Sequence, residues 1–478
     1  MLFNSFEFLI FLPIVFILYW FVFKKIQTQN LFILIASYIF YGWWDWKFLS
    51  LIILSSIIDY KVGLFLDETR DKKKRKYLLC FSLVFNLGIL GFFKYFNFFI
   101  DNWILAWSNL GVTMNHSSLN IILPVGISFY TFQTLSYSID IYREKLKPTK
   151  NLIAFASFVS FFPQLVAGPI ERATNLLPQF YKKRFFDYNL AISGVKLILW
   201  GLFKKIVIAD NCAIYVNEIF DTYQNQSSLT LIIGAIYFAF QIYGDFSGYS
   251  DIAIGTSRLF GFKLMRNFNY PYFSRDIAEF WRRWHISLST WFRDYLYIPL
   301  GGSKGTKWNQ VKNVFIIFLV SGFWHGANWT FIVWGGLNAL FFLPLLLTNK
   351  NRTHTDIVAK NRYFPTLKEL IQIISTFILI TLVWVFFRAE TIDQAIRYIS
   401  GIFINENIIK IDYINGIERY SFEVLFLIPI LCFFEWLYKN KETPFEGKFQ
   451  YLNEILIIIL LLVFGQYTNH SSFIYFQF

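Results

Sequence analysis

The sequence predicts an all-α protein that crosses a membrane many times, with about eleven transmembrane helices plus re-entrant and amphipathic helices. Of its 478 residues, 56% are hydrophobic and only 16% are charged, whereas charged residues make up about 25% of an ordinary soluble domain. Apolar runs recur from one end of the chain to the other, as at 8–23 and 452–467. Because no soluble domain fits between these runs, we expect residues 1–478 to form a single polytopic membrane domain.

The positive charges predict how the chain threads the membrane. Lys and Arg accumulate in short loops on the cytoplasmic side, so the basic blocks at 70–76, 143–150 and 255–312 are expected to be cytoplasmic. The segments 101–120 and 217–228 lack Lys and Arg and are expected to be outside loops. Contact with anionic lipid head groups accounts for the net charge of +13, and we expect no nucleic-acid partner.

The predicted spans follow one another along the chain. The first, at 8–23, ends at Lys24 and Lys25 and is not a removable signal peptide, because no small-residue cleavage site follows it. The loop at 388–420 carries charges of both signs and does not indicate a side. Further single spans are expected near 30–44, 48–66, 77–93, 121–139, 192–210, 229–249, 370–387, 421–438 and 452–468.

Two segments do not fit single straight spans. The apolar run within 152–184 is interrupted by Pro163, Gly168 and Pro169, and broken helices occur at membrane depth only where protein or a cavity covers the backbone. We therefore expect a re-entrant or half-helix element there. The segment 314–347 would span roughly 50 Å as one helix, too long for a hydrocarbon core of about 30 Å. A bent, doubled-back pair of helices fits it best.

A histidine lies near the expected bend, in the motif SGFWHGANW. Burial favours the neutral form of His325, and a neutral imidazole can act as a base. If the motif is helical, Ser321, Asn328 and Trp329 share the face of His325 through i±3 and i±4 spacing and would line a pocket. A structural histidine that hydrogen-bonds across a helix interface is an equally open interpretation.

A second candidate centre is the segment EFWRRWHISLSTWFRDYLYIPLGG at 279–302. Its aromatic residues alternate with arginines, which is typical of an amphipathic helix at the cytoplasmic interface. That interpretation leaves His285 unexplained, since this histidine lies two positions after the pair Arg282 and Arg283 and before a Ser-Leu-Ser step.

Together the two motifs resemble the signature of the membrane-bound O-acyltransferases (MBOAT), in particular the bacterial branch of the alginate O-acetyltransferase membrane subunit. The segments FPQLVAGPI at 162–170 and YGDFSGYSDIAIG at 243–255 are also similar to family segments. The resemblance covers roughly 120–345. It implies an acyltransferase in which His325 is the near-universal family histidine and His285 is the second functional polar position.

The resemblance also implies a reaction. A cytosolic acetyl-CoA would donate an acetyl group toward an extracytoplasmic polysaccharide, an alginate-like exopolysaccharide or peptidoglycan, through a periplasmic esterase-like partner protein. Acetyl-CoA would be a substrate, and no tightly bound cofactor or metal is expected. Arg282 and Arg283 would meet the phosphates of coenzyme A or anchor the chain to lipid, and Asn328 or Trp329 would donate to the developing oxyanion. The implied location is the bacterial inner membrane.

Three alternatives remain open at this point. One is transfer of D-alanyl or another acyl group from a carrier protein, although the motif of that branch lacks the ending YIPLGG found at 297–302. The others are an envelope-polymer transporter and a scaffold. The sequence shows no inverted repeat and no ladder of intramembrane ionisable residues, which transporters commonly have. The acceptor polymer is also open.

Overall fold

The computed structural model describes the chain at residues 1–114, 119, 121–166, 168–404, 421–467 and 473–474, and within these ranges all regular structure is helical. The predicted all-α fold is therefore confirmed. The chain divides into two compact units, the first formed by Met1–Val195 with Ala253–Met265 and the second by Lys196–Ile252 with Arg266–Phe478.

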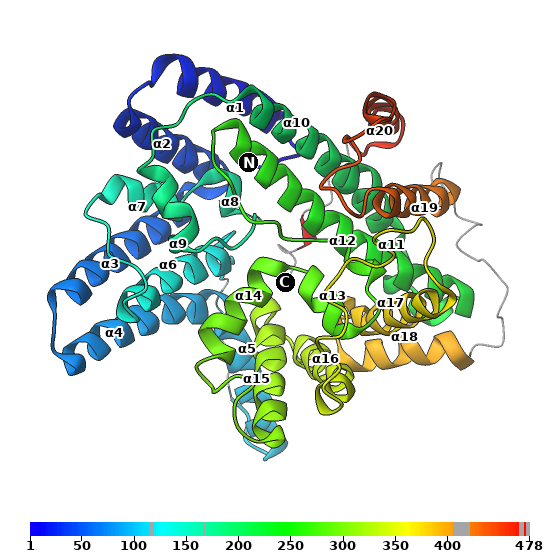
Figure 1. The fold of residues 1–478 in the computed structure, drawn as a ribbon. Coiled ribbons are helices and arrows are strands. Elements are labelled where there is room, and N and C mark those ends of the chain that lie inside the picture. The colour runs from blue at the N-terminus through cyan, green and yellow to red at the C-terminus, as the bar shows by residue number, and fades with distance from the viewer. Residues whose placement is uncertain (115–118, 120, 167, 405–420, 468–472, 475–478) are drawn as a thin grey trace. The chain divides into compact units, whose positions relative to one another are not determined.

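Two helices, which are labelled in Figure 1, contribute residues to both units. They are α10 (Tyr188–Leu202) and α12 (Ser228–Leu259). The first unit otherwise contains α1 (Phe6–Ile17), α2 (Ile26–Asp45), α3 (Leu49–Glu68), α4 (Lys72–Leu90), α5 (Phe96–Asn109), α6 (Ile127–Tyr142), α7 (Leu152–Val159), α8 (Phe162–Leu165) and α9 (Ala173–Leu176), with short 3₁₀ or π turns η1 (Leu18–Val22), η2 (Trp46–Phe48), η3 (Gly91–Tyr95) and η4 (Leu177–Phe180).

The second unit holds the two histidine motifs. It contains α11 (Asp210–Asp221), α13 (Ile277–Arg283), α14 (Ile286–Phe292), α15 (Lys307–His325), α16 (Trp329–Leu347), α17 (Leu367–Arg388), α18 (Ile392–Ile404), α19 (Ser421–Leu437) and α20 (Gln450–Phe464), with η5 (Phe203–Ala209), η6 (Tyr223–Asn225), η7 (Pro271–Phe273) and η8 (Arg293–Tyr297).

Several helical segments are suited to a bilayer. Among the described residues, five are long and apolar enough to cross a membrane, and they are Ile26–Glu68, Lys72–Asn109, Ser228–Leu259, Trp329–Leu347 and Leu367–Arg388. Three shorter apolar helices are Phe6–Val22, Leu152–Leu165 and Gln450–Phe464. These findings indicate a multi-pass membrane protein, and the count of about eleven spans stays a prediction.

The structure corrects two predicted loops. Helix α18 (Ile392–Ile404) occupies the described part of the loop predicted at 388–420. The segment 101–120 was expected to be a loop because it lacks Lys and Arg, but α5 continues to Asn109. A lack of positive charge predicts on which side of the membrane a segment lies, but not whether the segment is helical. Trp103 and Leu105 in this segment are apolar side chains that a helix accommodates. Residues 115–118 and 120, like 405–420 of the other loop, lie outside the described part of the chain.

The predicted break near Pro163 is confirmed. Helix α7 ends at Val159, and the one-turn helix α8 starts at Phe162 with Pro163 in its first turn, where the missing N–H of proline costs no hydrogen bond. Further short helices, α9 and η4, follow. Whether this segment is re-entrant stays a prediction.

The predicted doubled-back pair is also confirmed, as α15 and α16, which pack against each other (Figure 1). Helix α15 ends at His325 because Gly326 is extended, with φ −162° and ψ 154°. Helix α16 begins after Asn328, whose side chain accepts a hydrogen bond from the Thr330 backbone N–H at 3.0 Å. His325 is thus the last helical residue before the bend.

Two glycines bring the backbones of α15 and α16 into contact. A Cβ atom on Gly322 would lie 2.2 Å from the carbonyl oxygen of Phe331, and one on Gly335 would lie 2.3 Å from that of Phe318. Side chains at these positions would therefore force the helices apart. Because Gly322 precedes His325 by one helical turn, this close packing fixes the position of the histidine.

We expect Gly322→Ala to lower the free energy of unfolding by roughly 1–3 kcal/mol, because overpacked interiors must shift their backbones. Thermal unfolding in detergent would measure this. Gly336→Ala is the matched control, since a Cβ atom there would meet only Leu319 Cδ2 at 3.8 Å, and both substitutions gain the same helix propensity. Equal unfolding temperatures for the two variants would contradict this account of the packing.

Candidate active site

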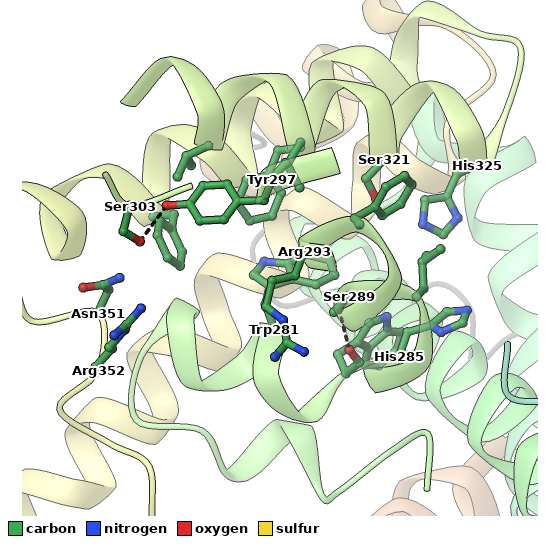
Figure 2. A pocket seen from close by; sticks show the side chains of 17 residues that line it. Trp281, His285, Ser289, Arg293, Tyr297, Ser303, Ser321, His325, Asn351 and Arg352 are labelled. Carbon is green, nitrogen blue, oxygen red and sulfur yellow. Dashed lines mark hydrogen bonds between the residues drawn. The ribbon is translucent and has the colours of Figure 1, made fainter. Parts of the chain in front are cut away.

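A cavity of about 220 Å³ opens in the second unit among α13, α14, η8, α15 and α16. Its lining is mostly apolar and aromatic. Figure 2 shows His285 and His325 at one end, and Ser303, Asn351 and Arg352 at the other. The polar lining residues are His285, Ser289, Arg293, Tyr297, Ser303, Ser321, His325, Asn351 and Arg352.

An aromatic cage surrounds His325. Its ring centroid lies 4.9 Å from that of Trp324, 5.2 Å from that of Trp334 on α16 and 5.3 Å from that of Phe387 on α17. All three rings meet the imidazole at steep angles, and only 6% of His325 is exposed. The ring is therefore held in one orientation with little access to water.

His285 reaches the same cavity from the turn between α13 and α14. Its backbone is left-handed, with φ 43° and ψ 56°, a conformation that costs about 1–3 kcal/mol and is often found at functional sites. The hydrogen bond from the Ile286 N–H to the Asn267 carbonyl, at 2.8 Å, fixes this turn. Burial lowers the pKa of His285 to about 3, so its imidazole is neutral at pH 7.

The cavity therefore brings together two histidines that lie forty positions apart in the sequence (325 − 285 = 40). Ser321, one turn before His325 on α15, lines the same space. The catalytic and substrate-binding roles of these residues stay predictions.

Asn328 and Trp329 do not line the cavity, contrary to the shared helical face expected for them. The helix stops at His325, so i+3 and i+4 spacing no longer applies beyond it. Asn328 instead caps α16 and donates to the Glu390 carbonyl at 2.8 Å. Trp329 is 51% exposed.

Arg282 and Arg283 also lie outside the cavity lining. Arg282 donates to the carbonyl oxygens of Asn351 and His354 at 2.8 and 2.7 Å, and Arg283 donates to that of Asp356 at 2.7 Å. Both guanidinium groups therefore hold the loop that follows α16, and this loop carries Asn351 and Arg352 into the cavity.

A buried carboxylate supports these arginines. Glu279, 1% exposed, contacts Arg283 at 2.8 Å and Arg275 at 3.0 Å. Arg275 in turn contacts Asp356 at 2.9 Å. One carboxylate thus neutralises two largely buried cations and connects α13 to the loop.

Sequence reasoning missed Arg293, Asn351 and Arg352 as site residues. The available signal for Arg293 was its spacing of four residues from Ser289, which places the two side chains on one face of a helix. In the structure both residues line the cavity. Asn351 and Arg352 carried no signal, since they belong to a basic flank far from 279–302 in the sequence. In the part of the chain that the structure describes, no group of three or more His, Cys, Asp or Glu residues could hold a metal ion.

The arrangement suits a proton transfer next to an elongated ligand. Two buried imidazoles lie at one end, where a base could act on a hydroxyl. Guanidinium and amide donors at the other end suit an anionic group. The cavity therefore fits a ligand with a reactive end and a negatively charged end.

Comparison with known proteins is consistent with this chemistry. Residues 142–387 match the membrane-bound O-acyltransferase family. The probable alginate O-acetylase AlgI of Azotobacter vinelandii is 40% identical over 409 residues, which cover 84% of this chain and 78% of the relative. The peptidoglycan O-acetyltransferase of Helicobacter pylori is 32% identical over 100% of this chain and 98% of its own.

A third similar protein, the teichoic acid D-alanyltransferase of Bacillus subtilis, is 30% identical over 47% of this chain and 60% of its own. The family match contains both histidine motifs, so the cavity lies within the shared region. The chain therefore belongs to the membrane-bound O-acyltransferase family, in the branch that contains the alginate O-acetylases, and is an O-acyltransferase.

Proposed function

We propose that this enzyme takes an acetyl group from cytosolic acetyl-CoA and passes it across the bacterial inner membrane toward a polysaccharide outside, through a periplasmic esterase-like partner protein. The observation that carries the proposal is the shared cavity, which has His285 and His325 at one end and polar and basic residues at the other. Acetyl transfer is favoured because relatives named for O-acetylation align over 84% and 100% of the chain, whereas the D-alanyltransferase aligns over 47%.

In the proposed mechanism His325 acts as the general base. Its neutral imidazole takes the proton from a hydroxyl, and the oxygen attacks the thioester carbonyl of acetyl-CoA. The carbon–sulfur bond then breaks, so the acetyl group becomes an ester on the oxygen. The proton held by His325 passes to the departing thiolate, giving free coenzyme A and restoring the neutral base. General base catalysis of this kind contributes about 10²–10⁴-fold.

Ser321 is the better candidate to stabilise the oxyanion. Its hydroxyl lies in the cavity one turn from His325, whereas Asn328 is engaged as a helix cap and Trp329 lies outside. Preorganised donors at the developing charge are the usual means of stabilising such an intermediate. Asn328 and Trp329 have no substrate contact in this proposal.

The phosphates of coenzyme A are assigned to the far end of the cavity. Arg352 lines that end and Arg293 lies between the two ends (Figure 2), whereas Arg282 and Arg283 support the loop rather than the ligand. With the acetyl group beside His325, the extended donor would place its nucleotide at the exposed Arg352, toward the side where the basic residues are predicted to be cytoplasmic.

We expect Arg352→Ala to raise the KM for acetyl-CoA by about 1.5- to 5-fold with little change in kcat, since an exposed ion pair contributes about 0.2–1 kcal/mol. Steady-state kinetics at several acetyl-CoA concentrations would measure this. Lys350→Ala is the control, because Lys350 carries the same charge on the same loop but does not line the cavity. An equal change in both variants would indicate a general charge effect instead of a phosphate contact.

The proposed function is tested by supplying different donors to the purified protein. Transfer or thioester cleavage with acetyl-CoA is the expected result. Activity only with a D-alanyl carrier protein would favour the alternative donor, and no activity with any thioester would favour a transporter or scaffold. Alginate-like and peptidoglycan acceptors are distinguished by which isolated polymer gains alkali-labile acetyl groups.

A further inference from the structure

We propose that Ser287 and Asn267 position His285 so that its Nε2 atom accepts a hydrogen bond from the donor, at the amide N–H of the pantetheine arm nearest the thioester sulfur. This inference rests on the proposed function, because it takes acetyl-CoA as the donor. It assigns His285 a part in donor binding and adds two positioning residues outside the cavity lining.

The hydrogen bonds around Asn267 determine which way its amide faces. The Ser287 backbone N–H contacts Asn267 Oδ1 at 3.2 Å, and a backbone N–H can only donate. The Asn267 atom that faces Ser287 is therefore the oxygen. Its amide nitrogen faces the other way and donates to Ser250 Oγ at 2.9 Å.

This orientation determines the tautomer of His285. Ser287 Oγ lies 2.9 Å from the same Asn267 oxygen, so the hydroxyl hydrogen is donated there. The hydroxyl oxygen can then only accept from His285 Nδ1, which lies 3.4 Å away. Nδ1 therefore carries the hydrogen in the neutral imidazole, and Nε2 carries the lone pair.

The Nε2 atom of His285 is the part of the ring left for a ligand. This atom is buried and makes no hydrogen bond within the described structure. His285 as a whole is 3% exposed, and it lines the cavity. Buried polar atoms of folded proteins nearly always have a partner. The left-handed backbone of His285 indicates that the fold holds this ring in place at a cost.

The chemistry of the donor supplies a matching group. In a coenzyme A thioester the sulfur is followed by two methylene groups and then an amide N–H. If the acetyl carbonyl lies beside His325, this amide lies a short distance along the arm, at the end of the cavity where His285 also lies. A neutral imidazole with its lone pair on Nε2 can accept from an amide N–H but cannot donate to a carbonyl.

We expect Ser287→Ala to weaken binding of coenzyme A by roughly 2- to 12-fold, the effect of losing one neutral hydrogen bond. Without Ser287, His285 is free to adopt the other tautomer, which places a hydrogen on Nε2 where the lone pair is needed. Asn267→Ala should act in the same direction. Direct binding of coenzyme A to the full-length protein is the readout, because it requires no acetyl transfer.

Two further variants separate positioning from simple damage to the fold. His285→Asn removes Nε2 but tolerates the left-handed backbone, and adding Ser287→Ala to it should cause no further loss of affinity. Thr290→Val is the control on the same helix. Its hydroxyl bonds only the Ile286 and Ser287 carbonyls, at 2.8 and 3.0 Å, and it does not line the cavity. We expect it to bind coenzyme A like the wild type.

The outcomes separate this inference from the proposed function. If the wild type binds coenzyme A and Ser287→Ala binds it equally well, the inference is overturned and the proposed donor stands. The inference is also overturned if Ser287→Ala lowers the affinity for coenzyme A as much in the His285→Asn protein as in the wild type. It is likewise overturned if Ser287→Ala lowers kcat while the affinity for coenzyme A is unchanged. No binding by the wild type would remove acetyl-CoA as the donor, and the inference with it.

Discussion

Replacing His325 with alanine is expected to lower the rate of acetyl transfer by about 10²–10⁴-fold, the usual contribution of a positioned general base. The imidazole lies in an aromatic cage of Trp324, Trp334 and Phe387 at the end of α15, and among the residues that line the cavity His285 is the one other histidine. His325→Gln, which keeps a polar side chain of similar size, should lose a similar factor. The measurement is acetyl transfer at matched membrane abundance.

His354→Ala is the matched control for His325. His354 is a histidine of the same unit that does not line the cavity. Arg282 contacts its backbone carbonyl, and its ring lies 4.0 Å from the Asp276 carboxylate. Its replacement should leave transfer close to normal. His285→Ala should impair transfer less than His325→Ala and in a donor-dependent manner. Near-normal transfer by a well-folded His325→Ala protein would leave His325 a structural residue.

Replacing Glu279 with glutamine is expected to destabilise the second unit by about 3–5 kcal/mol, the typical effect of removing one partner from a buried ion pair. The substitution keeps the size of the side chain but removes the charge between Arg275 and Arg283, whose side chains are only 6% and 10% exposed. The loop that carries Asn351 and Arg352 should lose order as well. Chemical or thermal unfolding of the purified protein would measure the loss.

A surface ion pair provides the comparison for Glu279. Asp393 and Arg397 are also spaced i,i+4, at 2.7 Å, but their side chains are 68% and 64% exposed. Solvent screens this pair, so Asp393→Ala should have a much smaller effect on unfolding than Glu279→Gln. If Glu279→Gln were as mild as Asp393→Ala, the buried carboxylate would not be the support of this region.

The sequence predicted the elements that depend on local pattern. Hydropathy placed the long helices, and the excessive length of 314–347 predicted the α15–α16 pair with His325 at its bend. The break near Pro163 was predictable because proline restricts the backbone directly. These features need no knowledge of distant contacts.

The remaining site features depend on tertiary packing. Helix α15 ends at His325, and the next residue, Gly326, packs so closely that a Cβ atom there would lie 2.1 Å from the Phe331 ring. Because the helix does not continue, the helical spacing that would have placed Asn328 at the cavity does not apply. Arg282 and Arg283 have protein partners that lie about seventy residues away along the chain. Arg352 lies on the loop whose backbone carbonyls those arginines contact, and it lines the cavity there. None of these contacts leaves a periodic signal in the sequence.

The central claim is that the cavity containing His325 moves an acetyl group from acetyl-CoA to a hydroxyl. The most direct measurement uses acetyl-CoA with a radiolabelled acetyl group. It is added to vesicles that contain the purified wild-type protein and the hydroxyl acceptor, and in parallel to vesicles that contain the His325→Ala variant and the same acceptor. The account predicts release of one free coenzyme A for each acetyl ester formed by the wild type, and a loss of about 10²–10⁴-fold in the variant. Equal rates for the two proteins, or no acetyl ester from the wild type, would contradict it.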